Sequence, residues 1–286
     1  MNNIVEIENP EYPQLLKEIS DPPKKLYFKG TWDSSLFERC LAVAGSRRMT
    51  AYGKQITCKL VSEIAGAGIT IVSGFMYGID ATAHQAAVEA WGKTIAVMPC
   101  GIDIIHPEYQ ESLHDRILES GGLIISEFER TFPPAVWTYP KRNRIMAGLS
   151  HAAMIVEAAE KSGSLITAGF AKEYGRRLFA VPGPLTSKHS VGTAQLIKGG
   201  ADIVTGPKDI LAEFNAAGHE SFKNSSQHSN LSGEEKIIIC ILEKEPMEID
   251  AVSRLAKISV SEAGSTISLM QLKGIVIEQE GKYYVN

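Results

Sequence analysis

Residues 45–48 read Gly-Ser-Arg-Arg and follow directly on a short apolar run. Such a run predicts a buried strand, and Thr50 can cap the helix that apolar spacing predicts over residues 50–65. In a strand–turn–helix unit, the first N–H groups of the helix point at one place and favour an anion. Arg47 and Arg48 add charge and forked donors that suit phosphate. This stretch predicts either a phosphate site or an ordinary turn with two solvated arginines.

Two other predicted strand ends carry small residues that suit a ligand. Gly74 follows the strand predicted over residues 69–73, and a glycine there lets the backbone approach a bound group closely. Ser162-Gly163-Ser164 opens a predicted helix, and Thr167 lies on its first turn. This helix start is a second candidate anion cradle. Nearby Glu157 and Glu160 are interpreted as capping or solvated carboxylates.

The most basic part of the chain begins at Lys141, Arg142, Asn143 and Arg144, at the start of a helix predicted over residues 141–149. Cations at a helix N-terminus oppose the macrodipole, so their presence favours a nearby anion, here a polyphosphate. The loop before them is rich in aromatic residues, and aromatic side chains beside basic ones suit single-stranded nucleic acid.

The composition restricts the classes of function. The formal net charge is −4, which argues against a general polyanion binder, so a nucleic-acid site must be local. Between residues 141 and 198 there are nine Lys or Arg against three Asp or Glu, as a local site requires. The four cysteines are far apart without a CxxC pair, which indicates free thiols in a reducing cytoplasm and no zinc site. We expect no signal peptide, membrane span, metal or cofactor.

Strand and helix patterns alternate over most of the chain. This alternation predicts an α/β fold, a Rossmann-like doubly wound and mainly parallel sheet with helices on both faces. Ligands of such sheets bind at the carboxyl ends of the strands. The predicted division is an N-terminal extension that packs on the core (1–39), the Rossmann-like domain (40–215), a polar linker (216–231) and a small winged-helix domain (232–286).

The predicted winged helix carries little charge on its would-be recognition helix. Residues 261–273 hold one lysine, Lys273, and one glutamate, Glu262. Strong duplex binding needs many phosphate contacts, so this composition favours protein contact or domain packing.

Taken together, the motifs resemble the DNA-processing protein A family, also called DprA or Smf. Five motifs carry the resemblance, in order: Gly45-Ser46-Arg47, Ser73-Gly74 with Gly78-Ile79-Asp80 and Ala83-His84, Lys141-Arg142-Asn143-Arg144-Ile145, Ser162 to Ala168, and Val181-Pro182-Gly183. The resemblance implies a non-catalytic, metal-free homodimer that binds single-stranded DNA, protects incoming DNA and helps load RecA recombinase during natural transformation.

By position, the resemblance implies that Gly45, Ser46 and Arg47 hold a DNA phosphate and that residues 141–144 line the same basic pocket. Three positions depart from the family pattern. Glu111 stands where a basic residue is often found, His106-Pro107 replaces the usual Tyr-Pro, and Ala194 replaces an asparagine. These departures imply a lower DNA affinity than is typical of the family.

Three other functions are alternatives to DNA binding. Rossmann-like phosphoribohydrolases carry a Pro-Gly-Gly-x-Gly-Thr run, whereas residues 181–184 read Val-Pro-Gly-Pro. A nucleotide-sensing or protein-binding module is a further alternative. NAD binding is the weakest, because GxGxxG is absent after the first strand of the predicted Rossmann-like domain.

Overall fold

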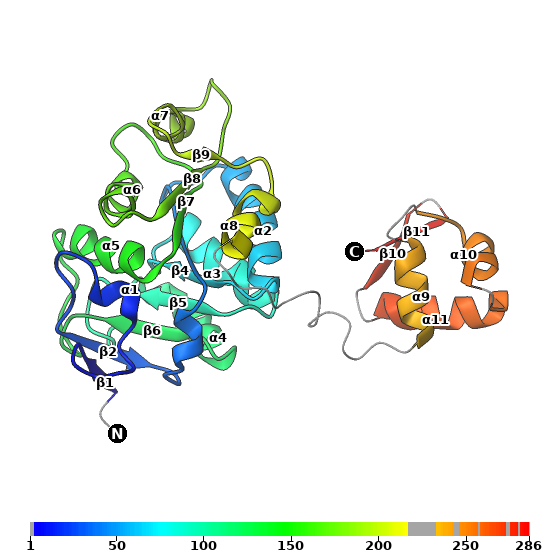
Figure 1. The fold of residues 1–286 in the computed structure, drawn as a ribbon, viewed down its shortest axis with the longest axis horizontal. Coiled ribbons are helices and arrows are strands. Elements are labelled where there is room, and N and C mark those ends of the chain that lie inside the picture. Colours follow the sequence, from blue (N-terminus) through cyan, green and yellow to red (C-terminus); the bar gives the residue numbers. More distant parts are fainter. Residues whose placement is uncertain are drawn as a thin grey trace. The chain divides into compact units, whose positions relative to one another are not determined.

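A computed structural model describes residues 3–216, 233–242, 246–256, 258–272, 275–279 and 281–285. The chain divides into two compact units, Met1–His219 and Glu220–Asn286. The first unit is an α/β domain and the second combines helices with a hairpin (Figure 1).

One nine-stranded sheet forms the centre of the first unit within the described residues, in the order β1-β2-β6-β5-β4-β3-β7-β8-β9. Strands β3 to β9 are parallel to one another, whereas β1 and β2 pair antiparallel. The predicted doubly wound and mainly parallel sheet is therefore confirmed. The strands are β1 Ile4–Glu6, β2 Lys25–Lys29, β3 Cys40–Ala44, β4 Thr70–Ser73, β5 Thr94–Val97, β6 Leu123–Ser126, β7 Ala152–Ile155, β8 Arg177–Ala180 and β9 Asp202–Ile203.

The strand order reverses at β3. From β3 the chain proceeds outward through β4, β5 and β6, and then returns to place β7 on the other side of β3. The connections after β3 and β7 therefore leave in opposite directions at the carboxyl ends of these two strands. A crevice opens at such a switch point, and this is where open α/β sheets bind their ligands.

Helices cover both faces of the sheet (Figure 1). Along β3, Ala42 packs in the cluster that holds α1, α5 and α6, while Leu41 and Val43 pack with α2, α3 and α8. This period-2 alternation gives a strand that is buried on both faces. The helices are α1 Gln14–Lys17, α2 Ala51–Gly66, α3 Ile79–Glu89, α4 Glu111–Glu119, α5 Thr138–Leu149, α6 Ser164–Glu173, α7 Val191–Lys198 and α8 Pro207–Ala216, with 3₁₀ turns at Ser34–Phe37, Glu108–Gln110 and Lys188–Ser190.

The N-terminal segment is an integral part of this core. Strand β2 pairs with β6 and so extends the sheet, and β1 pairs with β2. Leu16 and Leu26 are fully buried, and a side chain on Gly148 of α5 would collide with Leu16. Strands β1 and β9, with three and two residues, were not predicted because such short segments show no periodicity.

The second unit contains α9 Gly233–Leu242, α10 Ile249–Ala256, α11 Val260–Leu272, and the antiparallel pair β10 Val276–Gln279 and β11 Lys282–Val285. Ile238, Val252 and Ile267 form its small core. These elements are the ones expected of a winged helix, and that assignment stays a prediction. Helix α11 contains no Lys or Arg within its bounds. The predicted linker lies outside the described residues, apart from Ala216 at the end of α8.

Among the helices of the described residues, none combines the length and the apolar character needed to cross a lipid bilayer.

Candidate functional site

A cavity of about 620 Å³ lies at the switch point of the sheet. Its walls come from the β3–α2 loop, from α5 and from the start of α6. The lining includes polar and charged residues and the glycines beside them, namely Gly45, Ser46, Arg47, Arg48, Asp80, Tyr139, Arg142, Asn143, Ser162, Gly163, Ser164, Thr167 and His189. Of the predicted site residues, the structure therefore brings eight together here, while Gly74, Lys141 and Arg144 are not in the lining.

The β3–α2 loop supplies two cations. Arg47 and Arg48 are both exposed, and the Arg48 N–H donates to Ser46 Oγ at 3.1 Å. The Arg47 guanidinium carbon lies 4.6 Å from the centre of the Tyr139 ring. A Cβ on Gly45 would come within 2.5 Å of the Ile79 side chain, so only glycine lets this loop pack on α3. Both arginines are free to meet an anion.

The start of α6 forms another wall. Ser162 Oγ and Ser164 Oγ are hydrogen-bonded at 2.8 Å, and Asn143 Nδ2 of α5 donates to the Gly163 carbonyl at 3.3 Å. Thr167 is only 1% exposed, and its hydroxyl has no hydrogen-bond partner among the described residues. A buried hydroxyl without a partner is costly, so this one suits a ligand that brings an acceptor. The positive end of the helix favours an anionic one.

The start of α2, which the sequence suggested as an anion site, is already filled. The Thr50 N–H and hydroxyl donate to the buried Glu157 carboxylate at 2.9 and 2.6 Å. A Cβ on Gly53 would come within 2.2 Å of that carboxylate. Glu157, from the segment after β7, thus occupies the anion position at this helix start, and the phosphate site predicted for the Gly45-Ser46-Arg47 loop stays a prediction. Glu157 caps α2 and not the helix that follows it in the sequence.

The cations at the start of α5 are also matched from within the protein. Lys141 Nζ lies 3.2 Å from Glu127, and Arg144 lies 2.5 Å from the same carboxylate and 3.3 Å from Asp21. Lys141 also lies over the rings of Phe128 and Trp137. Within the described residues, Glu127 and Asp21 offset these charges. Burial raises the pKa of Glu127, and Arg144 and Lys141 counter this effect.

Arg142 is 3% exposed and serves mainly as a structural cation. Its Nη1 donates to the carbonyls of Gly74 and Val97, at the ends of β4 and β5. Burial lowers the pKa of Arg142 to about 10, although the neighbouring Asp80 favours its charged form. A Cβ on Gly74 would lie 2.4 Å from both Arg142 Nη2 and Asp80 Oδ2. Gly74 is therefore required for this buried contact and does not itself line the cavity.

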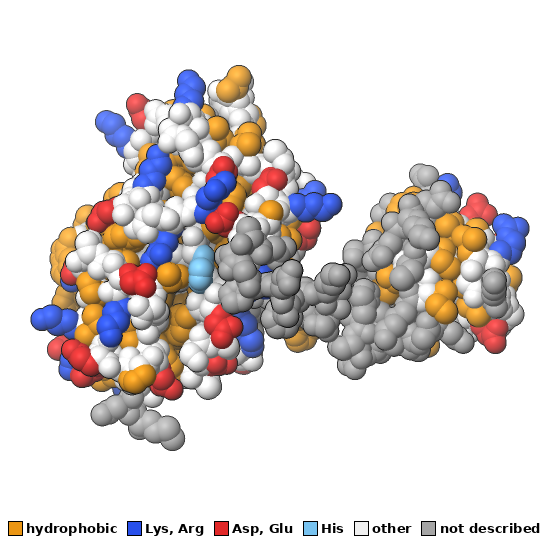
Figure 2. Space-filling model, viewed as in Figure 1, with side chains coloured by type: hydrophobic (Ala, Val, Ile, Leu, Met, Phe, Trp, Pro, Cys, Tyr) orange, Lys and Arg blue, Asp and Glu red, His pale blue; other side chains and the backbone are white. Residues whose placement is uncertain are grey.

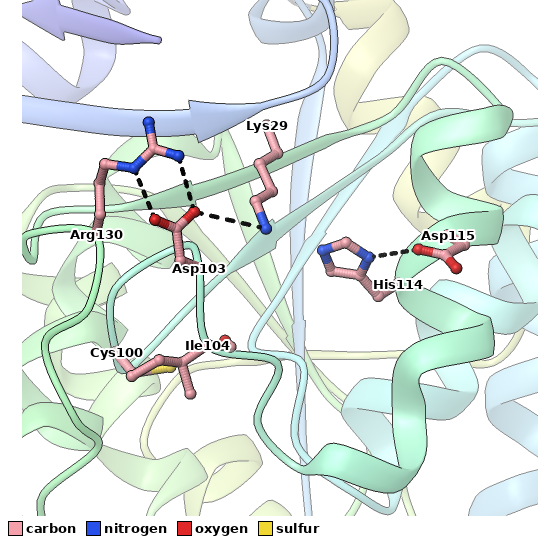
Figure 3. A network of polar contacts seen from close by, with 7 residues as sticks. All are labelled: Lys29, Cys100, Asp103, Ile104, His114, Asp115 and Arg130. Carbon is pink, nitrogen blue, oxygen red and sulfur yellow. Dashed lines mark hydrogen bonds and ion pairs between the residues drawn. The ribbon is translucent and has the colours of Figure 1, made fainter.

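Other charged groups of the first unit pair away from the cavity. Asp103 lies between Arg130, which donates to it at 2.7 and 3.1 Å, and Lys29 at 3.8 Å (Figure 3). Figure 2 shows Lys and Arg interspersed with Asp and Glu on the visible face of this unit, rather than gathered in a stripe. The cavity is therefore a local cationic site on a surface of mixed charge.

The part of the chain that the structure describes contains no cluster of metal ligands, and two of its cysteines are buried. No group of three His, Cys, Asp or Glu side chains there could hold a metal ion. Cys40 and Cys100 are buried, and burial raises the pKa of both thiols, so they are poor nucleophiles.

Sequence reasoning missed three cavity residues. Tyr139 belongs to the aromatic-rich loop without being assigned to the site, Asp80 stands in the motif Gly78-Ile79-Asp80 without a role, and His189 is not among the predicted site residues. His189 Nδ1 lies 3.3 Å from Ser46 Oγ, although 143 positions separate the two residues. Asp80 and Tyr139 carried a usable signal, because Asp80 is part of a recognised motif and Tyr139 lies close before the basic motif at Lys141; His189 carried none.

Comparison with known proteins agrees with the fold and the motifs. The family model for DNA recombination-mediator protein A matches residues 3–215. Protein Smf of Escherichia coli is 34% identical over 288 residues, covering 99% of this chain and 77% of that protein. DNA processing protein DprA of Bacillus subtilis is 40% identical over 212 residues, covering 74% of this chain and 71% of that protein.

Solved structures show the same relation. DprA of Streptococcus pneumoniae superposes with a TM-score of 0.69 at 39% identity, covering 73% of each chain. DNA processing protein A of Helicobacter pylori, whose structure describes a unique single-stranded DNA binding mode, has a TM-score of 0.66 at 34% identity, covering 75% of this chain and 96% of that one. The first unit is therefore the fold of a bacterial DNA-processing protein. The chain belongs to the DNA recombination-mediator protein A family.

We expect Arg144→Met to lower the free energy of unfolding by about 3 kcal/mol, because the buried Glu127 loses its closest cation while the apolar stem is kept. Urea unfolding followed by circular dichroism measures the loss. Arg130→Met, which breaks the exposed pair with Asp103, is the matched control and should change stability little. Equal effects of the two variants would contradict a structural role for Arg144.

A second prediction concerns pH. Burial raises the pKa of Asp80 to about 6 from its ordinary 3.8, so the folded protein binds this proton more tightly than the unfolded chain does. The wild type should therefore lose about 1–3 kcal/mol relative to Asp80→Asn as pH rises from 4 to 7.

Urea unfolding at several pH values measures this difference. Asp103→Asn is the control of opposite sign, because Arg130 lowers the pKa of Asp103 and so stabilises the fold at higher pH. Parallel stability curves for the wild type and Asp80→Asn would show that Asp80 carries its charge throughout this range.

Proposed function

We propose that the cavity binds the phosphate backbone of single-stranded DNA. One observation carries the proposal: the start of α6, with the unpartnered Thr167 hydroxyl, and the unpaired Arg47 and Arg48 line the same cavity. The Thr167 hydroxyl can donate a hydrogen bond, and the N-terminal end of α6 is positive. Each guanidinium group can donate two parallel hydrogen bonds to the oxygens of one phosphate. All three features favour the same chemical group.

The surroundings of the cavity favour a single strand over a duplex. Tyr139, Val136 and Ile166 line it beside the arginines, and Val136 and Ile166 are exposed. Apolar and aromatic surface next to phosphate-binding groups can contact unstacked bases, which a duplex does not offer. The net charge of −4 and the short list of unpaired cations imply few phosphate contacts, so affinity should be modest.

The predicted binding residues then take two roles. Direct contact is proposed for the cavity-lining residues Gly45, Ser46, Arg47, Arg48, Asn143, Ser164 and Thr167, of which Arg47 and Arg48 are exposed and Thr167 is buried. Support is proposed for Gly74, Lys141, Arg142 and Arg144, which already contact other groups of the protein. This division follows from the cavity lining and from these contacts.

The wider role follows from the family. We infer that the protein is a non-enzymatic, cytoplasmic recombination mediator that protects incoming DNA and helps load RecA during natural transformation, and that it acts as a homodimer. The DNA-binding structure of the Helicobacter pylori relative and the family match support this role.

Arg47→Glu should weaken binding of a labelled single-stranded oligonucleotide by at least about tenfold, because it reverses a charge in the cavity. Fluorescence anisotropy at several salt concentrations measures this. Each phosphate contact contributes about 0.7 to the slope of log K against log salt, so the variant's slope should also be smaller.

Arg116→Glu on α4 makes the same charge change outside the cavity lining and is the control. A flat salt titration, or wild-type affinity in Arg47→Glu, would exclude this site. Binding or hydrolysis of mononucleotides instead would favour the Rossmann-like nucleotide-binding or phosphoribohydrolase alternative.

The mediator role predicts that the protein shortens the lag before RecA hydrolyses ATP on single-stranded DNA, since filament nucleation limits that lag. Arg47→Glu should lose this effect together with DNA binding. An identical lag with and without the wild-type protein would contradict the proposed RecA loading. It would leave the proposed DNA binding unaffected.

A further inference from the structure

Arg47 has only one close support among the residues that the structure describes. No carboxylate lies within ion-pair distance of its guanidinium, and none of its side-chain nitrogens has a hydrogen bond. What holds it is the ring of Tyr139, 4.6 Å from the guanidinium carbon. An arginine without such support loses up to about 2 kcal/mol of side-chain entropy when a ligand orders it.

Tyr139 is held in turn by His106. A hydrogen bond of 2.8 Å joins His106 Nε2 to the Tyr139 hydroxyl oxygen, and the two ring centres lie 6.2 Å apart. Tyr139 lies in the first turn of α5, and His106 in the loop that follows β5. The Tyr139 ring is thus held at two points. Its backbone belongs to α5, and its hydroxyl is hydrogen-bonded to His106 of the loop after β5.

The charge on His106 is compatible with this arrangement. Burial and then the nearby Arg47 lower the pKa of His106, so at neutral pH the imidazole is uncharged and does not repel the guanidinium. His106 is not among the residues that line the cavity. The Tyr139 ring is the group that contacts both His106 and Arg47.

We propose that His106 is a positioning residue, which fixes the Tyr139 ring and thereby holds Arg47 in place for a phosphate of the DNA. The proposal rests on the proposed function of the cavity. A guanidinium that is ordered before binding pays less entropy on contact, which is how preorganisation raises affinity.

The test is a set of double-mutant cycles read out by single-stranded DNA affinity at low salt, where weakened variants still bind. His106→Leu and Tyr139→Phe each remove one partner of the hydrogen bond, and Tyr139→Phe keeps the ring. Each should raise Kd by about fivefold, because an Arg47 side chain that is no longer held in place loses more entropy when DNA orders it. Because the two residues act as a unit, the double variant should also raise Kd by about fivefold.

Two further comparisons test whether His106 and Tyr139 affect DNA affinity through Arg47. In an Arg47→Ala background, His106→Leu and Tyr139→Phe should change Kd by less than about twofold, since the group they position is gone. His106→Gln, which keeps a polar group near the Nε2 position, should restore most of the affinity. Tyr109→Phe removes a phenol oxygen from a side chain that is 72% exposed outside the cavity, and is the matched control.

Multiplicative effects of His106→Leu and Arg47→Ala would overturn the proposal, because they would mean that His106 contacts DNA directly or acts elsewhere. An unchanged Kd in both His106→Leu and Tyr139→Phe would overturn it as well. Thermal unfolding of each variant checks the fold, and Tyr139→Phe carries the test if His106→Leu is unstable. No DNA binding by the wild type would overturn the proposed function itself, and this inference with it.

Discussion

The buried guanidinium of Arg142 is the constraint on which the site depends. A charge without water must be surrounded by acceptors, and Arg142 finds them in the Gly74 and Val97 carbonyls and in the neighbouring Asp80. These groups come from the ends of β4 and β5 and from α3. The guanidinium therefore joins three elements to α5 and fixes where the first turn of that helix, with Tyr139, meets the cavity.

The protein neutralises most of its own positive charge near the site. Glu127 matches the cations of α5, and Glu157 caps α2, so neither position remains open to a ligand. Among the residues that line the cavity, Arg47 and Arg48 have no ion pair within the part of the chain that the structure describes. This selective compensation explains how a chain of net charge −4 presents a local cationic cavity. A phosphate elsewhere near the site would have to displace Glu127 or Glu157 from the donors that these carboxylates already occupy.

Much of the fold could be predicted because its signals are local. Apolar strands alternating with amphipathic helices identify the parallel sheet, and the Gly45-Ser46-Arg47 loop falls at the expected strand end. The partners of charged residues could not be predicted, because they are distant in sequence: 107 positions separate Thr50 from Glu157, and 143 separate Ser46 from His189. Counting cations along the chain does not show which of them are paired or buried. Burial distinguishes the exposed Arg47 and Arg48 from the buried Arg142 and Arg144.

The two edges of the nine-stranded sheet are short. Strand β1 has three residues and β9 has two, and so neither offers a long row of unpaired backbone groups. Long exposed edges invite strand addition and aggregation, and short edge strands are one way in which proteins prevent it. With both edges this short, copies of the domain at high local concentration have little backbone through which the sheet could continue from one molecule to the next.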